Sequence, residues 1–150
     1  MASYHFHLTQ VKRSRGQSVI AQAAYRAGEK LYSTYYGESS DFTRKRGVVM
    51  AEICLPDHAP REYADRETLW NALEWAESGR KAQLAHSFDI TLMNEFSMEE
   101  NIEMVRAFVQ EELVSRGMIA DFAIHDPVRL RWNFYIKRVK RKTRWTSRYS

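Results

Sequence analysis

Cysteine and long apolar runs are nearly missing from this chain. Cys54 is the single cysteine among 150 residues, so no disulfide can form within the chain, and its setting in residues 52–55 is typical of a small core residue. No apolar run approaches the roughly 20 residues of a membrane-spanning helix, and the first residues lack the pattern of a secretory signal. We therefore expect one compact cytoplasmic domain without a membrane segment.

Charge is distributed unevenly along the chain, although the net charge is only +4. Residues 12–46 hold eight Lys/Arg against three Asp/Glu, residues 47–127 hold six against sixteen, and residues 128–150 hold nine against none. A basic block of this kind is where a nucleic-acid backbone would bind. We interpret the acidic middle as a solvated outer face.

A helix predicted from Ser18 to about Leu31 follows a basic loop and carries Tyr25. Ser18 can cap this helix, and the free N–H groups of the first turn, beside basic residues, predict a phosphate site. The hydroxyl of Tyr25 is then a candidate nucleophile, whereas residue type alone favours an ordinary half-buried aromatic. The basic residues expected to contact DNA are Lys12, Arg13, Arg15, Arg26, Arg44, Lys45 and Arg46.

Alternating apolar and polar residues predict strands over residues 3–9, 86–92 and 119–125, and a further strand is expected over residues 48–55. One helix is predicted over residues 65–77, with an inward apolar stripe that includes Ala76. A second helix is predicted to begin at a capping box formed by Ser97 and Glu100 and to end at Gly117. Each of the three alternating strands, 3–9, 86–92 and 119–125, pairs an apolar face with one bearing His, Asp, Ser or Thr. We therefore expect an α/β (α+β) two-layer sandwich, an antiparallel sheet with helices on its apolar face and a polar floor on the other.

Seven segments carry a further pattern: residues 4–5, 24–30, 42–45, 47–49, 81–85, 94–101 and 121–125. In order and spacing they resemble the MobA/MobL relaxases (HUH-type) of mobilisable plasmids and integrated elements, over residues 1–127. The resemblance implies the same two-layer fold and a nickase that cuts single-stranded DNA at a transfer origin. Tyr25 matches the nucleophile that stays bound to the new 5′ end as a phosphotyrosine. Accessory mobilisation proteins and a coupling protein are the partners that it implies.

The resemblance also implies a divalent metal, Mg²⁺ or Mn²⁺, held by three histidines. One lies on the strand that here carries His125, and two lie in a Pro-His-x-His strand shortly after it, but no histidine follows His125 in this chain. Asp89 is a candidate base or partner of His125 on the direction of its strand face alone. His5 and His7 share a face at a spacing that suits a metal, but a structural or DNA-contacting role is favoured for them.

Residues 128–150 combine nine cations with aromatics, a composition typical of single-strand binders. The competing interpretation is a frameshift near codon 128 that replaced the metal strand; in either case Trp132, Phe134 and Ile136 alternate as an edge strand would. We therefore divide the chain into an incomplete relaxase-like domain, 1–127, and a basic aromatic tail, 128–150. The function predicted is a truncated or divergent relaxase domain, and whether it acts as an enzyme stays open. The alternative is a non-catalytic nucleic-acid-binding module or a decayed remnant.

Overall fold

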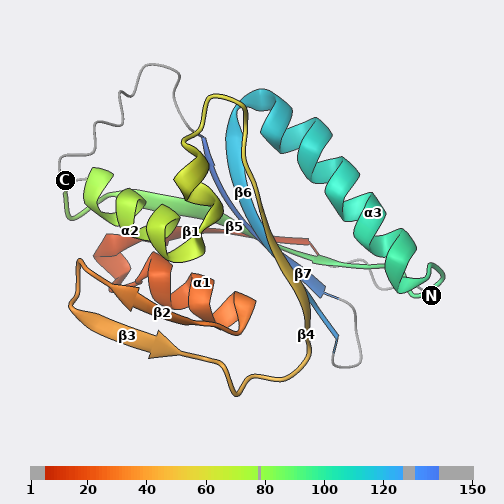
Figure 1. The fold of residues 1–150 in the computed structure, drawn as a ribbon, viewed down its shortest axis with the longest axis horizontal. Coiled ribbons are helices and arrows are strands. Elements are labelled where there is room, and N and C mark those ends of the chain that lie inside the picture. Colours follow the sequence, from red (N-terminus) through yellow and green to blue (C-terminus); the bar gives the residue numbers. More distant parts are fainter. Residues whose placement is uncertain (1–5, 78, 127–130, 139–150) are drawn as a thin grey trace.

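The computed structural model describes residues 6–77, 79–126 and 131–138, the last range by its backbone alone (Figure 1). Its larger sheet has five strands, all paired antiparallel, in the order β1-β5-β7-β6-β4. Helices against an antiparallel sheet confirm the mixed α/β class. The strands of this sheet are β1 (Phe6–Lys12), β4 (Val48–Cys54), β5 (Gln83–Thr91), β6 (Met118–His125) and β7 (Arg131–Arg138).

Each α-helix begins at a residue whose side chain accepts a hydrogen bond from the first turn, because the first N–H groups of a helix have no partner within it. The helices are α1 (Val19–Ala27), α2 (Arg66–Ala76) and α3 (Met98–Phe108), and their caps are Ser18, Asp65 and Ser97. The predicted capping box is confirmed, since the Glu100 carboxylate accepts in turn from the Ser97 backbone N–H at 2.8 Å.

Helices cover both faces of the sheet, which corrects the expectation of helices on one face only. Phe122 and Ile124 of β6 pack with α3, whereas Ile119 packs with α1 and α2. Figure 1 shows α3 on one side of the strands and α1 with α2 on the other. The predicted polar face of β6 carries Asp121, which is buried because Arg66 and Trp70 of α2 donate hydrogen bonds to it. A polar face can thus be covered when its polar groups find partners.

The first strand is more exposed than its alternation predicts. Phe6 and Leu8 are 49% and 51% exposed, and burial begins only at Val11. β1 is an edge strand that pairs with β5 alone, so the expectation of a half-buried strand is wrong for residues 6–9. Tyr4 and His5 lie outside the described residues.

The tyrosine helix is shorter than predicted. It ends at Gly28, whose φ of 66° is left-handed and whose N–H bonds the Ala24 carbonyl, instead of continuing to Leu31. The chain then forms an unpredicted hairpin of β2 (Lys30–Ser33) and β3 (Glu38–Asp41). Each of these strands has only four residues, too few for a clear alternating pattern.

The second helix has the predicted position but a different buried stripe. Ala76 is exposed, whereas Glu74 is completely buried together with Leu69, Trp70 and Leu73. A carboxylate is rarely buried unless it is paired, and Glu74 has partners 55 and 61 residues away in the sequence. Local periodicity carries no signal for such partners.

Strand β7 lies at the centre of the sheet, between β5 and β6, rather than at an edge as predicted. In register, residue 133 lies between Asp89 and Ala123, and residue 131 lies opposite His125. Residues 127–130 and 139–150, which hold most of the predicted tail, lie outside the described residues. Among the described residues, no helix is long and apolar enough to cross a membrane.

Candidate functional site

Tyr25 lies in the last turn of α1 at the edge of a cavity of about 430 Å³. Its side chain is 53% exposed. Because positions three or four apart lie on one helix face, α1 lines the cavity with a single stripe, and β5 supplies the opposite wall. The structure therefore brings together Tyr25 and Asp89, the two predicted catalytic residues. The other lining residues are Ser18, Ala21, Gln22, Arg26, Phe42 and Ser87.

The ring of Tyr25 is held between two residues of the loop that follows β3. Phe42 meets it edge-on, with ring centroids 5.3 Å apart and planes at 89°, and Lys45 Nζ lies 3.6 Å from the ring centroid. Lys45 Nζ also donates a hydrogen bond of 2.8 Å to the Tyr25 carbonyl. A cation over an aromatic face and an edge-to-face ring pair both fix the orientation of the phenol. The sequence analysis did not identify Phe42 as a site residue, although Phe42 is the first residue of one of the seven segments that resemble the family.

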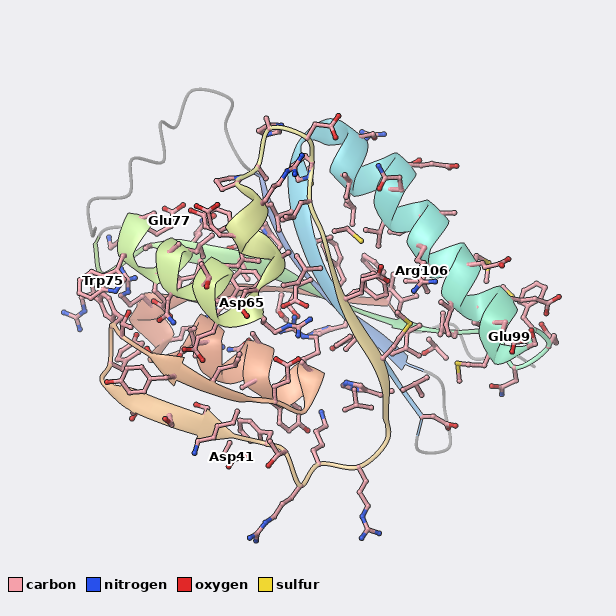
Figure 2. The ribbon with its side chains drawn as sticks, viewed as in Figure 1. Asp41, Asp65, Trp75, Glu77, Glu99 and Arg106 are labelled. Atoms are coloured by element: carbon pink, nitrogen blue, oxygen red, sulfur yellow. The ribbon has the colours of Figure 1, made fainter. Side chains whose placement is uncertain are left out.

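The same loop presents two of the predicted DNA contacts. Asp41, labelled in Figure 2 where β3 ends, accepts bonds from the Thr43 hydroxyl at 2.7 Å and the Thr43 N–H at 3.0 Å. These bonds lower the pKa of Asp41 and fix the start of the loop. Arg44 and Arg46 are exposed, as a phosphate contact requires. Lys45 instead faces Tyr25, and burial, followed by the nearby Arg26, lowers its pKa.

The N-terminus of α1 is already occupied by a carboxylate of the chain itself. Glu74 Oε1 accepts from the Val19 N–H at 3.1 Å, and the Ser18 hydroxyl accepts from the Ala21 N–H at 3.2 Å. Glu74 is completely buried. A helix N-terminus attracts an anion, and here that anion is Glu74, so the predicted phosphate site at this end of α1 is wrong.

Arg13 neutralises Glu74 instead of facing solvent, which corrects its expected role in DNA contact. One amino group donates to the Glu74 carbonyl at 2.6 Å and to its carboxylate at 3.1 Å, and the other donates to the Glu77 carbonyl at 2.7 Å. Its side chain is only 10% exposed. Lys12 is half-buried, and Arg15 at the end of the short helix η1 (Arg13–Arg15) is exposed.

Arg26 is buried under the cavity rather than exposed on the surface. It is 3% exposed, and its guanidinium donates to the carbonyls of Asp121 and Gln22 at 3.4 and 3.3 Å. Because it lines the cavity, its charge acts on whatever enters. It therefore cannot be one of the surface contacts to an extended strand that the sequence predicts.

His125 lies behind α1, with Nε2 2.7 Å from the Arg26 carbonyl. A carbonyl only accepts hydrogen bonds, so Nε2 carries the proton and Nδ1 holds the lone pair of the neutral ring. Burial lowers the pKa of His125; the cations Lys45 and Arg26 act in the same direction, while the carbonyl bond and Asp89 oppose it. The imidazole is therefore neutral at pH 7, as a metal ligand or a base must be.

The described residues do not fit the three-histidine metal site that the family pattern implies. No three His, Cys, Asp or Glu side chains gather as ligands among the residues whose side chains are described. His125 offers one ligand atom, Nδ1, and His7 lies exposed on β1, away from it in the sheet order. A single imidazole is too small a ligand set for a metal site of the three-histidine kind. His5 lies outside the described residues.

A buried ion pair that the sequence did not indicate joins α2 to β6 beside this site. Arg66 donates from two nitrogens to the two Asp121 carboxylate oxygens, both at 2.9 Å, and a third nitrogen reaches Glu29 at 2.6 Å. Two-point pairing of this kind is geometrically specific. The ion pair holds α2 against the sheet and so fixes the position of Glu74, which lies on the same helix.

Cys54 is a structural residue, as predicted. It packs against the core cluster under α3, and burial raises the pKa of its thiol to about 11. The thiolate, which is the reactive form, is therefore scarce at neutral pH.

Comparison with known protein families gives a match to the MobA/MobL family over residues 17–139. The matched region includes β7 and so continues beyond Pro127, where the sequence resemblance was expected to stop.

Individual relatives support the same assignment. The chain is 34% identical to a probable mobilization protein MobA of Bifidobacterium longum and 38% identical to the conjugal transfer protein TraA of Rhizobium radiobacter, each over 84% of this chain. It spans only 22% and 12% of their lengths. A structure from a study of vancomycin resistance transfer in Staphylococcus aureus superposes with a TM-score of 0.84 at 32% identity, covering 91% of this chain and 70% of the other.

Proposed function

The chain belongs to the MobA/MobL family, and from this premise we propose that it is a relaxase domain that binds single-stranded DNA at a transfer origin, with Tyr25 as the nucleophile. Its relatives are named for mobilisation and conjugal transfer. One observation carries the proposal: an exposed tyrosine, oriented by Phe42 and Lys45, shares a cavity with Asp89. Such a domain would work in the cytoplasm with accessory mobilisation proteins and a coupling protein.

The proposed step is a transesterification. The Tyr25 oxygen forms a bond to phosphorus, and the bond from phosphorus to the 3′ oxygen breaks, which leaves the 5′ end on the tyrosine. The phenol proton passes to the Asp89 carboxylate, and the 3′ oxygen leaves as a hydroxyl after taking a proton from water. Arg26, which lines the cavity, supplies positive charge near the phosphate.

Covalent trapping tests the nucleophile. A single-stranded oligonucleotide that spans the cognate origin should give a protein–DNA adduct that survives a denaturing gel. Tyr25→Phe should give none, because phenylalanine keeps the contacts to Phe42 and Lys45 and lacks the hydroxyl. An adduct of equal yield from Tyr25→Phe would reassign the nucleophile to Tyr32, Tyr35 or Tyr36. Tyr36 is the weakest of these alternatives, since burial and then Glu74 raise its pKa.

A second candidate function is a nucleic-acid-binding module without strand transfer. It is favoured by the sequence after His125, which contains no histidine to complete the family's metal site. No step of the proposed reaction is assigned to Mg²⁺ or Mn²⁺, because the described ligands do not fit a metal. This candidate predicts single-strand binding without an adduct and weak Mn²⁺ binding by calorimetry. Micromolar Mn²⁺ affinity that His125→Ala abolishes would contradict it.

We also propose a test of the predicted frameshift origin of residues 128–150, against which the family match as far as residue 139 counts. β7 makes residues 131–138 part of the sheet, so the division at Pro127 concerns the origin of the sequence rather than separate folding units. Another reading frame of the DNA beyond the Pro127 codon should then encode Pro-His-x-His. If no frame does, these residues are a natural divergence and the binding-module function gains support.

A further inference from the structure

Two tyrosines at the tip of the β2–β3 hairpin and Trp75 of α2 form a cluster of three exposed rings. The cluster contacts Arg13, which pairs with Glu74 at the N-terminal end of α1. Tyr35, Tyr36 and Trp75 are 37%, 40% and 50% exposed. Tyr35 lies between the other two, with centroids 4.9 Å from Tyr36 and 5.1 Å from Trp75. Figure 2 shows Trp75 at the end of α2, far from Arg106 and Glu99 on α3. We call these three residues the aromatic cluster.

The aromatic cluster is held rigidly although it is exposed. Trp75 Nε1 donates to the Thr34 hydroxyl at 2.8 Å, and the Thr34 N–H donates to the Asn71 side chain at 3.0 Å. Asn71 in turn donates to the Tyr32 carbonyl at 2.8 Å. The hairpin is therefore tied to α2 at several points. A ligand that binds there would not have to order the rings first, so little conformational entropy would be lost.

Arg13 links the aromatic cluster to chain segments that carry exposed cations. The Arg13 guanidinium lies 4.5 Å from the Tyr35 ring centroid and also donates to the Gly79 carbonyl at 3.2 Å. It thereby joins the cluster to the loop of residues 79–82, whose Ala82 carbonyl accepts from the Arg13 N–H at 3.2 Å. The exposed cations of η1 and of the loop 79–82 are Arg15, Arg80 and Lys81. The nearby carboxylates are Glu74, neutralised by Arg13, and Glu38 and Glu77.

We propose that the aromatic cluster is a second contact site for single-stranded DNA, where bases stack on Trp75 and Tyr36 while Arg15, Arg80 and Lys81 bind the flanking phosphates. Exposed rings interleaved with cations favour single strands, because every base has a face that can stack and every nucleotide a phosphate. Tyr25 lies six residues after Val19, the first residue of α1, so the N-terminal end of the helix is about 9 Å from Tyr25 along the axis at 1.5 Å per residue. A strand bound at both places would span at least about three nucleotides at the stacked spacing of 3.4 Å.

This inference rests on the proposed function, and binding measurements separate the two. With a labelled oligothymidylate of about 20 nucleotides, Trp75→Ala should weaken binding about tenfold, which is typical of one lost stacking contact. Trp75→Phe keeps a ring and should retain most of the affinity. Phe96→Ala, which removes an exposed aromatic before α3, is the matched control and should bind as the wild type does.

Salt dependence gives a readout that a merely structural role would not produce. Trp75→Ala should leave the slope of log affinity against log salt unchanged, because stacking releases no counterions, whereas Arg15→Ala or Lys81→Ala should each reduce it by about 0.7. Wild-type affinity in Trp75→Ala would overturn the inference. If Arg44→Ala and Arg46→Ala still weakened binding, the proposed function would stand without the second contact site. A wild-type chain with no affinity for single strands would overturn both.

Discussion

The two ends of α1 differ in how far side chains of the protein itself cover them. At its N-terminus the chain supplies its own anion, Glu74, and its own cation, Arg13, and both are largely buried. At its C-terminus Tyr25 is exposed beside a cavity that Arg26 and Asp89 also line. A helix N-terminus is thus an anion site only if the fold has not already filled it. In this chain the proposed reaction lies at the C-terminal end, which the helix dipole makes less favourable for an anion.

Removing Glu74 should produce the largest effect on stability. Glu74→Ala leaves the Arg13 guanidinium without its carboxylate and the Val19 N–H without an acceptor, and breaking a buried pair costs about 3–5 kcal/mol. Glu77→Ala is the matched control, because Glu77 is only half-buried and its backbone carbonyl, which accepts from Arg13, is retained, so the loss should be smaller than in Glu74→Ala. Urea unfolding followed by circular dichroism measures both. Equal losses in the two variants would contradict the closed end of α1.

At the open end, Lys45→Met should slow adduct formation about fivefold, since a cation–π contact contributes roughly 1 kcal/mol. Methionine keeps most of the aliphatic stem, so stability should change by less than about 0.5 kcal/mol. Lys45 positions the ring rather than reacting, so the rate at saturating DNA should fall while the affinity stays the same. A variant that lost affinity but reacted at the wild-type rate when saturated would place Lys45 on the DNA backbone instead.

The exposed arginines of the same loop should act on binding alone. Arg44→Ala and Arg46→Ala should each reduce the salt slope of single-strand binding by about 0.7. Arg13→Ala, at the closed end, should lower the free energy of unfolding instead. A test of the tail should delete residues 139–150, because deletion from residue 128 would also remove the central strand β7.

The smallest effect concerns pH. Because burial lowers the pKa of His125 in the folded state, the unfolded chain binds a proton more readily below its ordinary pKa of about 6.5. The contribution of His125 to stability is therefore complete above that pH and is lost as the pH falls toward the lower, folded value. Unfolding free energies measured between pH 7.5 and 5 should fall more steeply in the wild type than in His125→Gln. Parallel profiles would contradict a buried, neutral His125.

Local patterns predicted those parts of the molecule that local interactions determine. The capping box of Ser97 and Glu100, the end at Gly117 of the helical segment that continues α3, and the alternation of β6 each depend on residues a few positions apart. The basic loop before the predicted helix pointed to Tyr25, and the polar face of the predicted strand pointed to Asp89. These two residues share the cavity.

Long-range pairs explain what the sequence did not reveal. Glu74 and Arg13 are 61 positions apart, and Asp121 and Arg66 are 55 apart. Each pair buries charges that a local reading assigns to a solvated face or to DNA. Once those charges are neutralised, helices can cover a face of the sheet that looks polar in the sequence. The hairpin of β2 and β3 was missed for a different reason, because its strands are short.

The most direct test of the account is to locate the DNA on the protein. Trypsin cleaves after Arg15 and Arg26, so Tyr25 is the sole tyrosine of peptide 16–26, whereas Tyr32, Tyr35 and Tyr36 share peptide 31–44. After reaction with single-stranded origin DNA and nuclease digestion, mass spectrometry should find a nucleotide bound to peptide 16–26. A nucleotide on peptide 31–44, or on neither peptide while single strands still bind, would contradict Tyr25 as the nucleophile.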